Sequence, residues 1–97
     1  MSTFATELKR YNIKPDGWDD FFEVWRRIVA VRKRLGFNVL FALADKEKNI
    51  FTWAVSHDDF DAAADRYYKD PERVELEIVA NWVTDYEITR VEQVPIP

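Results

Sequence analysis

The sequence predicts an α+β fold with the element order β-α-β-β-α-β, in which helices cover one face of a four-stranded antiparallel sheet. Two observations predict it. Apolar runs typical of strands stand near both ends of the chain and, as a pair, in its middle. Between them lie segments whose apolar residues recur at helical spacing. The length of 97 residues fits one core, so residues 1–97 are interpreted as a single domain.

The first strand and the first helix are separated by a turn that contains proline and glycine. Residues 6–13 are interpreted as the strand, and a helix is expected over 18–35. Asp16 is the expected N-cap of this helix, and Gly36 is the expected left-handed residue after it. Arg32 lies near the middle of the apolar face, which is otherwise formed by Trp18, Phe21, Phe22, Trp25, Ile28, Val29 and Leu35.

The second half of the chain begins with a hairpin. Its strands are expected over 37–45 and 50–57, joined by a short polar loop. A second helix is expected to begin near Asp58, and Asp70-Pro71-Glu72 is a fresh helix start, with a cap, a proline and an acid in order. The last strand is expected over 83–94. This order is the ferredoxin-like, or split βαβ, arrangement.

Both hairpin strands are apolar on both faces. In the first strand, alternation puts Phe37, Val39, Phe41 and Leu43 on one side and Leu40, Ala42 and Ala44 on the other. Helices from this chain suffice for one face only, and an exposed apolar face favours association. We therefore expect a second copy to cover the open face as a homodimer. The alternative is a monomer whose C-terminal segment folds across the sheet.

Composition excludes several classes of site. The net charge of −4 and a pI near 4.9 argue against nucleic-acid binding, which needs Lys and Arg to neutralise phosphates. The absence of Cys and the single His exclude thiolate and multi-histidine metal sites in one chain, so no metal and no cofactor are expected. A charged N-terminal segment and the lack of a long apolar run predict a cytoplasmic protein without a membrane span.

Several short motifs point to a family. Residues 7–17 (ELKRYNIKPDG) resemble the opening strand and turn of NIPSNAP-like domains, and Phe22 with Trp25-Arg26 resembles the start of their first helix. Phe51-Thr52-Trp53 and Asp70-Pro71-Glu72-Arg73 are similar too. These domains belong to the dimeric α+β barrel superfamily, together with antibiotic-biosynthesis monooxygenases, haem-degrading monooxygenases, isomerases and dehydratases. The resemblance implies a dimeric α+β barrel but no single reaction, because one fold hosts many functions.

Two titratable residues are candidates for chemistry. His57 is a candidate general base or haem ligand, because a histidine titrates near neutral pH. The alternative is a structural histidine that caps the next helix. Arg32, on the apolar helix face, is placed to hold a carboxylate or enolate oxygen in a pocket between helix and sheet. Alternatively, only its stem is buried and its guanidinium reaches the helix end or solvent.

The remaining candidates are polar residues of the first strand and several aromatic residues. Arg10 and Asn12 share one side of the strand and are interpreted either as polar points in an apolar pocket or as edge or dimer-interface groups. A group of aromatic residues has two interpretations: they line a pocket for an aromatic ligand, or they belong to the core or the interface. They are Trp25, Trp53, Tyr67, Tyr68 and Tyr86.

Three functions follow from these candidates. The first is a homodimeric barrel that binds a small apolar or aromatic molecule between sheet and helices. The second is a cofactor-independent monooxygenase or isomerase on an aromatic or polyketide-like substrate, with His57 as base and Arg32, or Arg10 with Asn12, holding the oxyanion. The third is haem degradation, for which the resemblance implies an Asn, a Trp and a His, present here as Asn12, Trp53 and His57.

Overall fold

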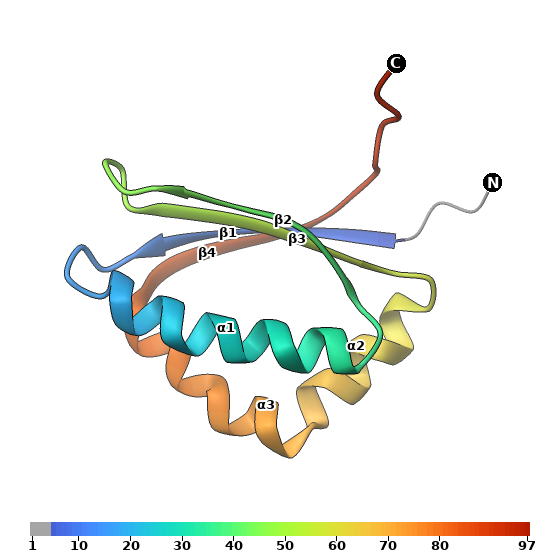
Figure 1. Ribbon diagram of the computed structural model, residues 1–97, viewed down its shortest axis with the longest axis horizontal. Coiled ribbons are helices and arrows are strands. Elements are labelled where there is room, and N and C mark those ends of the chain that lie inside the picture. Colours follow the sequence, from blue (N-terminus) through green and yellow to red (C-terminus); the bar gives the residue numbers. More distant parts are fainter. Residues whose placement is uncertain (1–4) are drawn as a thin grey trace.

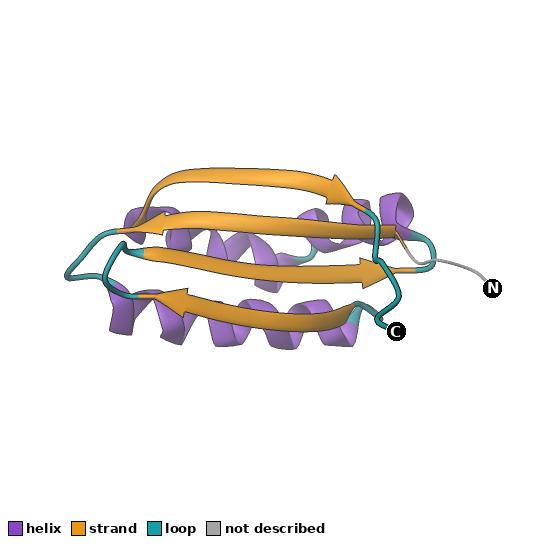
Figure 2. Cartoon of the chain, turned by 90° about the horizontal axis from the view of Figure 1, so that it is seen from above, coloured by secondary structure: helices purple, strands orange, loops and turns teal. Residues whose placement is uncertain are grey.

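A computed structural model of the chain describes residues 5–97. It confirms the predicted order and the four-stranded antiparallel sheet, and all the helices lie on one face of that sheet (Figures 1 and 2). The sheet order is β2-β3-β1-β4, with strands β1 (Ala5–Ile13), β2 (Asn38–Asp45), β3 (Ile50–His57) and β4 (Val83–Val91). The helices are α1 (Trp18–Arg34), α2 (Phe60–Lys69), α3 (Pro71–Glu75) and the 3₁₀ helix η1 (Leu76–Trp82).

Two glycines set the limits of α1. The N-cap is Gly17, and no side chain caps this end, so the predicted Asp16 cap is wrong. A Cβ on Gly17 would lie 2.7 Å from Cδ1 of Trp82, which leaves no room for a side chain at this turn. Gly36 follows the helix at φ 87°, in the left-handed region that was predicted for it.

The cap of α3 is the one predicted from Asp70-Pro71-Glu72. The Asp70 carboxylate accepts a hydrogen bond of 3.0 Å from the backbone N–H of Glu72, and Pro71 opens the helix. The same carboxylate accepts 2.9 Å from Nη2 of Arg34, which links the start of α3 to the end of α1. The two helices are thereby held together under the sheet.

Two predicted boundaries differ from the structure by a few residues. Helix α2 begins at Phe60, not near Asp58, because the intervening residues form a turn. Strand β4 ends at Val91, short of the predicted limit, and residues 92–97 are an exposed segment without a strand. In Figure 1 this segment leads away from the sheet on the side without helices, and Gln93 near its start donates 2.9 Å to Oγ1 of Thr6.

A bulge in β2 corrects the predicted faces of that strand. The register pairs Val39 with Val55 but Phe41 with Ala54, so Leu40 is an extra residue. Directly opposed residues of antiparallel strands share a face. Val39 therefore faces the helices, whereas Phe41 and the following alternate residue, Leu43, face the other side.

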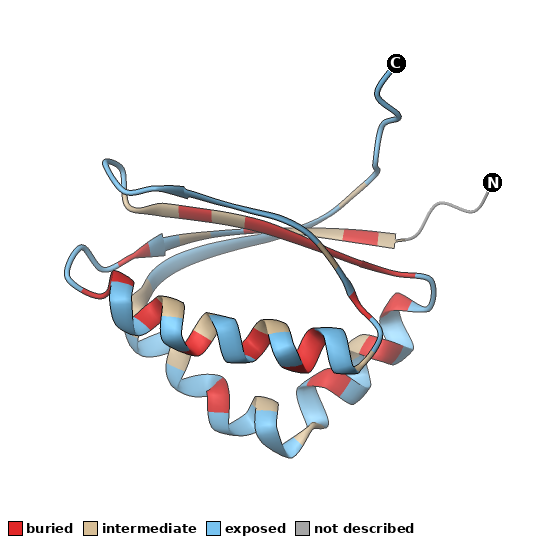
Figure 3. Ribbon diagram, viewed as in Figure 1, coloured by how far each residue is buried: buried red, intermediate tan, exposed pale blue. Residues whose placement is uncertain are grey.

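The core lies between α1 and the helix-facing side of β3, and the edge strands β2 and β4 are mostly exposed (Figure 3). Aromatic rings dominate it: Phe21 packs edge-on against Phe51 at 5.0 Å between centroids, and Trp25 against Trp53 at 5.7 Å. Within residues 5–97, no helix is long and apolar enough to cross a membrane.

Candidate functional site

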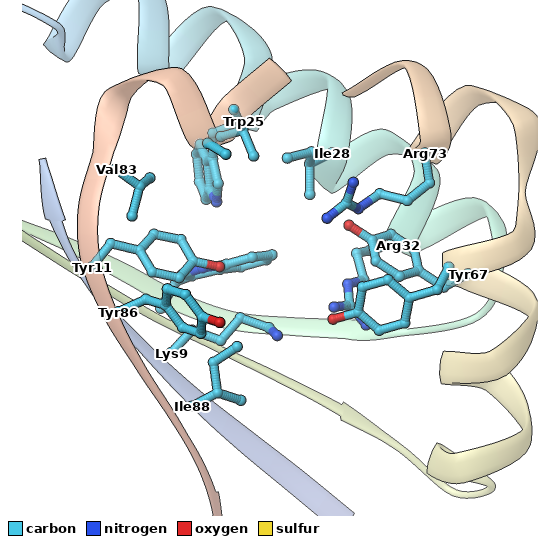
Figure 4. A pocket seen from close by; sticks show the side chains of 14 residues that line it. Lys9, Tyr11, Trp25, Ile28, Arg32, Tyr67, Arg73, Val83, Tyr86 and Ile88 are labelled. Atoms are coloured by element: carbon cyan, nitrogen blue, oxygen red, sulfur yellow. The ribbon is translucent and has the colours of Figure 1, made fainter. Parts of the chain in front are cut away.

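A cavity of about 220 Å³ lies between the sheet and the helices, and we call it the sheet–helix cavity. Strands β1, β3 and β4 form its floor, and α1, α2, α3 and η1 form its walls (Figure 4). Its rim includes Tyr86 and Ile88 of β4, which are 66 % and 43 % exposed, so the cavity opens beside that strand. Its lining consists of Lys9, Tyr11, Trp25, Ile28, Arg32, Trp53, Tyr67, Tyr68, Arg73, Val79, Ala80, Val83, Tyr86 and Ile88.

Lys9 reaches the cavity from the centre of the sheet. It is opposite Trp53 in the register and is only 1 % exposed. Its Nζ lies 2.6 Å from Oε1 of Glu7, its neighbour on the same face of β1. Burial, together with the positive charge of nearby Arg32, lowers the pKa of Lys9 from 10.5 to about 8. The cavity therefore holds an amine that loses its proton close to neutral pH.

Arg32 is placed inside the protein by the apolar face of α1. It is 1 % exposed, and its guanidinium carbon lies 3.7 Å from the ring centroid of Tyr67 and 4.6 Å from that of Phe37. Its Nε and Nη1 have no hydrogen-bond partner among residues 5–97. The guanidinium thus lies in the cavity wall, and the alternative in which it reaches solvent does not describe this structure.

Arg73 approaches the same tyrosine from α3. Its guanidinium carbon lies 5.2 Å from the ring centroid of Tyr67, and its Nε and Nη1 also find no partner in the described part of the chain. Burial raises the pKa of the Tyr67 hydroxyl, although Arg32 and Arg73 oppose this shift. The tyrosine therefore stays neutral between two cations.

The structure brings all five candidate aromatic residues to this cavity. Trp25 and Trp53, which pack edge-on against each other, both have an indole N–H without a hydrogen-bond partner within residues 5–97. Tyr67 and Tyr68 stand at the other end, 4.9 Å apart between centroids, and Tyr86 stands at the rim.

Arg10 and Asn12 do not face the sheet–helix cavity. They alternate with Lys9 and Tyr11 along β1, so they lie on the face without helices, where both are exposed. Opposite them in β4 are Glu87 and Asp85, and these groups line a separate, polar hollow together with Ile50 and Tyr86. Arg10 and Asn12 are therefore not polar points in the cavity that Arg32 lines.

His57 serves the packing of the turn between β3 and α2. Its Nδ1 accepts a hydrogen bond of 2.9 Å from the N–H of Asp59, and its Nε2 lies 3.3 Å from the carbonyl oxygen of Leu35. Oδ1 of Asp58 also lies 3.0 Å from Nδ1. With both ring nitrogens engaged and no part in the cavity lining, His57 connects the end of α1 to the start of α2.

The three residue types that haem degradation would use are likewise separated. Asn12 and Trp53 lie on opposite faces of the sheet, and His57 lies outside the cavity that holds Trp53. Among the described residues, no three His, Asp or Glu side chains are grouped as a metal site requires.

Lys9, Tyr11 and Arg73 are the site residues that the sequence interpretation missed. A signal for the first two was present in the first strand. Ile13 ends this strand as a buried residue, and the residues that alternate back from it are Tyr11, Lys9 and Glu7. Arg73 carried no comparable signal, because it lies in a five-residue helix without an apolar stripe.

Comparison with known proteins gives the fold. No protein-family model and no curated protein sequence matches the chain. An uncharacterised NIPSNAP domain protein from Burkholderia xenovorans has a TM-score of 0.76 and 15 % identity, over 95 % of this chain and 94 % of its own. A NIPSNAP family protein from Agrobacterium tumefaciens has a TM-score of 0.80 and 12 % identity, over 100 % and 91 %.

A third solved structure extends the likeness. A protein from Bacteroides thetaiotaomicron, described provisionally as an antibiotic biosynthesis monooxygenase, has a TM-score of 0.78 and 24 % identity, over 98 % of this chain and 91 % of its own. The chain has the NIPSNAP and antibiotic-biosynthesis-monooxygenase fold. The resemblance noted in the sequence is therefore confirmed at the level of the fold.

Proposed function

We propose that this protein is a homodimer that binds a small aromatic molecule in the sheet–helix cavity of each chain. The observation that carries the proposal is the lining of that cavity, which combines a wall of aromatic rings with a few buried polar groups. Small-molecule sites usually have this composition. The cavity of about 220 Å³ is of the same order as the roughly 150 Å³ cavity that binds benzene in an engineered protein, so one substituted ring fits it.

The binding test uses a neutral aromatic probe and the indole signals of the four tryptophans. Benzamide is titrated into ¹⁵N-labelled protein, and the indole N–H signals are followed by NMR. We expect the signals of Trp25 and Trp53 to shift. That of Trp18, whose N–H donates 2.9 Å to Oδ1 of Asn49 outside the cavity, is expected to stay. Ile28→Phe, which fills the cavity, is expected to abolish the shifts. Unchanged Trp25 and Trp53 signals at millimolar benzamide would contradict the binding proposal.

Support for the homodimer comes from the open face, the name we give to the apolar part of the side without helices. It lies beside the polar hollow and is formed by Leu8, Phe41, Leu43, Ile50 and Ala54. Phe41 and Leu43 are 42 % and 62 % exposed in the single chain, and no helix lies on that side (Figure 1). In the segment 92–97, Gln93 donates 2.9 Å to Oγ1 of Thr6 at the end of this face, and all six residues of the segment are exposed. A second copy supplies an equally apolar face, as two-fold dimers require.

The dimer is tested by light scattering after gel filtration at micromolar concentration. We expect a mass twice the 11.6 kDa of the chain. Phe41→Glu on the open face is expected to give monomers, whereas Ile78→Glu, at a similarly exposed apolar residue of η1, is expected to leave the dimer intact. A monomeric wild-type protein would remove the dimer from the proposal.

A second candidate function is cofactor-independent proton transfer, as in an isomerase, and the position of Lys9 favours it. In the neutral form, Nζ of Lys9 takes a proton from the carbon beside a ketone, and the electron pair moves to the oxygen as an enolate. The free N–H groups of Arg32 stabilise this enolate, and the ammonium returns the proton to carbon. Lys9 thus takes the role that the sequence interpretation gave to His57.

The proton-transfer candidate is tested by deuterium exchange. The α-hydrogens of 2-indanone are followed by NMR in D₂O, with wild-type protein and with Lys9→Met. Exchange above the buffer rate is expected for wild type only, rising with pH through about 8 as the amine loses its proton. Equal rates in both proteins would reject this candidate and leave the binding proposal untouched.

A further inference from the structure

The buried polar atoms of the sheet–helix cavity that lack partners are all of one kind. Within residues 5–97 they are the indole N–H groups of Trp25 and Trp53 and two N–H groups each on Arg32 and Arg73. Every one is a hydrogen-bond donor. A buried donor without a partner costs about 1–3 kcal/mol. A ligand that carries acceptor atoms removes this cost, whereas one that carries donors does not.

The charged residues of the cavity also favour a ligand that carries acceptor atoms. Arg32, Arg73 and Lys9 line it, and the described ion pairs include only one carboxylate with any of them, Glu7 at Lys9. No carboxylate of residues 5–97 lies within 4.0 Å of either guanidinium. Cations withdrawn from water in this way normally have an anionic partner. The uncompensated positive charge therefore favours an anion.

The two guanidinium groups are at one end of the cavity and the indoles at the other. Arg32 and Arg73 flank Tyr67, at 3.7 Å and 5.2 Å from its ring centroid. Trp25 lies at the opposite end in Figure 4, and Trp53 packs against it at 5.7 Å between ring centroids. The Nζ of Lys9 points into the space between the two ends. A ligand with a flat apolar part at one end and a compact anionic group at the other matches this arrangement.

We propose that the cavity binds a small aromatic carboxylate, with the carboxylate between Arg32 and Arg73 and the ring against Trp25 and Trp53. This inference rests on the proposed function and names the class of its ligand. The planar guanidinium fork matches the two oxygens of a carboxylate, which accept hydrogen bonds from two N–H groups at once. The indole N–H groups then face the π-electrons or a further acceptor of the ring.

The test compares benzoate with benzamide, which has the same shape and no charge. Affinities are measured by calorimetry, and the indole signals of Trp25 and Trp53 locate the bound probe. We expect benzoate to bind on the order of tenfold more tightly than benzamide, because hydrogen bonds to charged groups are the stronger ones. Arg73→Gln is expected to remove this difference, so that the two affinities become about equal. Arg66→Gln, at an exposed arginine of α2 outside the cavity, is the matched control and is expected to change neither.

Arg32→Met serves as the second variant, because Arg32 is fully buried and its loss affects packing. An unchanged Trp18 indole signal shows that this variant is folded. The variant, like Arg73→Gln, is expected to lose the preference for benzoate over benzamide. Equal affinity for benzoate and benzamide in wild type overturns the carboxylate assignment and leaves aromatic binding standing. Binding of neither probe overturns the proposed function with it. Benzoate binding that leaves the Trp25 and Trp53 signals unchanged places the anion elsewhere and refutes the inference.

Discussion

Replacement of Lys9 by Met is expected to change how the stability of the protein depends on pH. Lys9 is almost completely buried, and its pKa falls from 10.5 to about 8 in the folded chain. One unit of pKa corresponds to about 1.4 kcal/mol, so the charged amine costs the folded state about 3 kcal/mol at neutral pH. Methionine has a similar length and carries no charge, so it removes this cost.

The sign of the pH dependence follows from the bound protons. Between pH 8 and 10.5 the unfolded chain keeps the Lys9 proton, whereas the folded chain has lost it. Where the unfolded state binds more protons, stability rises with pH. From pH 7 to pH 9.5 the wild-type protein should gain about 2 kcal/mol relative to Lys9→Met. Burial raises the pKa values of Tyr11 and Tyr67, which act in the opposite direction at higher pH, so the comparison stops at pH 9.5.

Urea unfolding at a fixed protein concentration measures this difference, with tryptophan fluorescence as the signal. Wild type, Lys9→Met and Lys48→Met are compared at intervals of half a pH unit. Lys48 lies in the exposed hairpin loop, so its variant should follow the wild-type curve. Lys9→Met also loses the contact with Glu7, so the change of stability with pH is compared and not its absolute value. If the stabilities of wild type and Lys9→Met run parallel from pH 7 to 9.5, the amine is not buried as described and the reasoning fails.

Substitutions at three other positions test the residues that hold the cavity in place. Gly36→Ala should lower the free energy of unfolding by about 1–2 kcal/mol, because the backbone φ of this residue is 87° and the new Cβ would lie 3.2 Å from Nε2 of His57. An unchanged melting temperature would show that this turn tolerates a side chain. Asp70→Ala should cost about 1 kcal/mol through the lost cap and the lost bond to Arg34, while Asp70→Asn, which still caps, should keep most of the stability in the same urea titration. His57→Ala should lower the free energy of unfolding by about 1–3 kcal/mol, because the N–H of Asp59 and the carbonyl of Leu35 lose their partner. The affinity for benzamide, measured by calorimetry, should stay unchanged. A large loss of affinity would show that His57 belongs to the binding site.

The elements were predictable wherever short-range signals decide them. The helix before Gly36 shows an apolar stripe and a left-handed stop, and the start at Asp70 shows a cap followed by proline, all within a few residues. The order of strands and helices followed from these signals, and so did Arg32, because a charge in the middle of an apolar stripe is visible without tertiary information.

The polar residues of the site were harder to predict from the sequence. The sequence of a strand shows which residues share a face, but not which face meets the helices. Lys9 and Arg10 are adjacent cations. Lys9 alternates with Tyr11 and Ile13, and the pairing of β1 with β3 places it opposite Trp53, on the face that meets the helices. The prediction from the sequence instead placed the side chain of Arg10 in the ligand pocket. Arg73 depends on how α3 folds back toward α1, through contacts between residues far apart in the chain, so no local pattern indicated it.

The bulge at Leu40 has a consequence for how such proteins diverge. A regular strand would pair Phe41 with Trp53 and bury it beneath the helices; one additional residue instead pairs it with Ala54 and turns it outward. The composition of the strand is unchanged, and only the count differs. A related chain in which Leu40 pairs regularly with Ala54 would therefore bury Phe41 and Leu43 and present Leu40 and Ala42 outward, so the pairing of one residue decides which side chains an assembly partner meets.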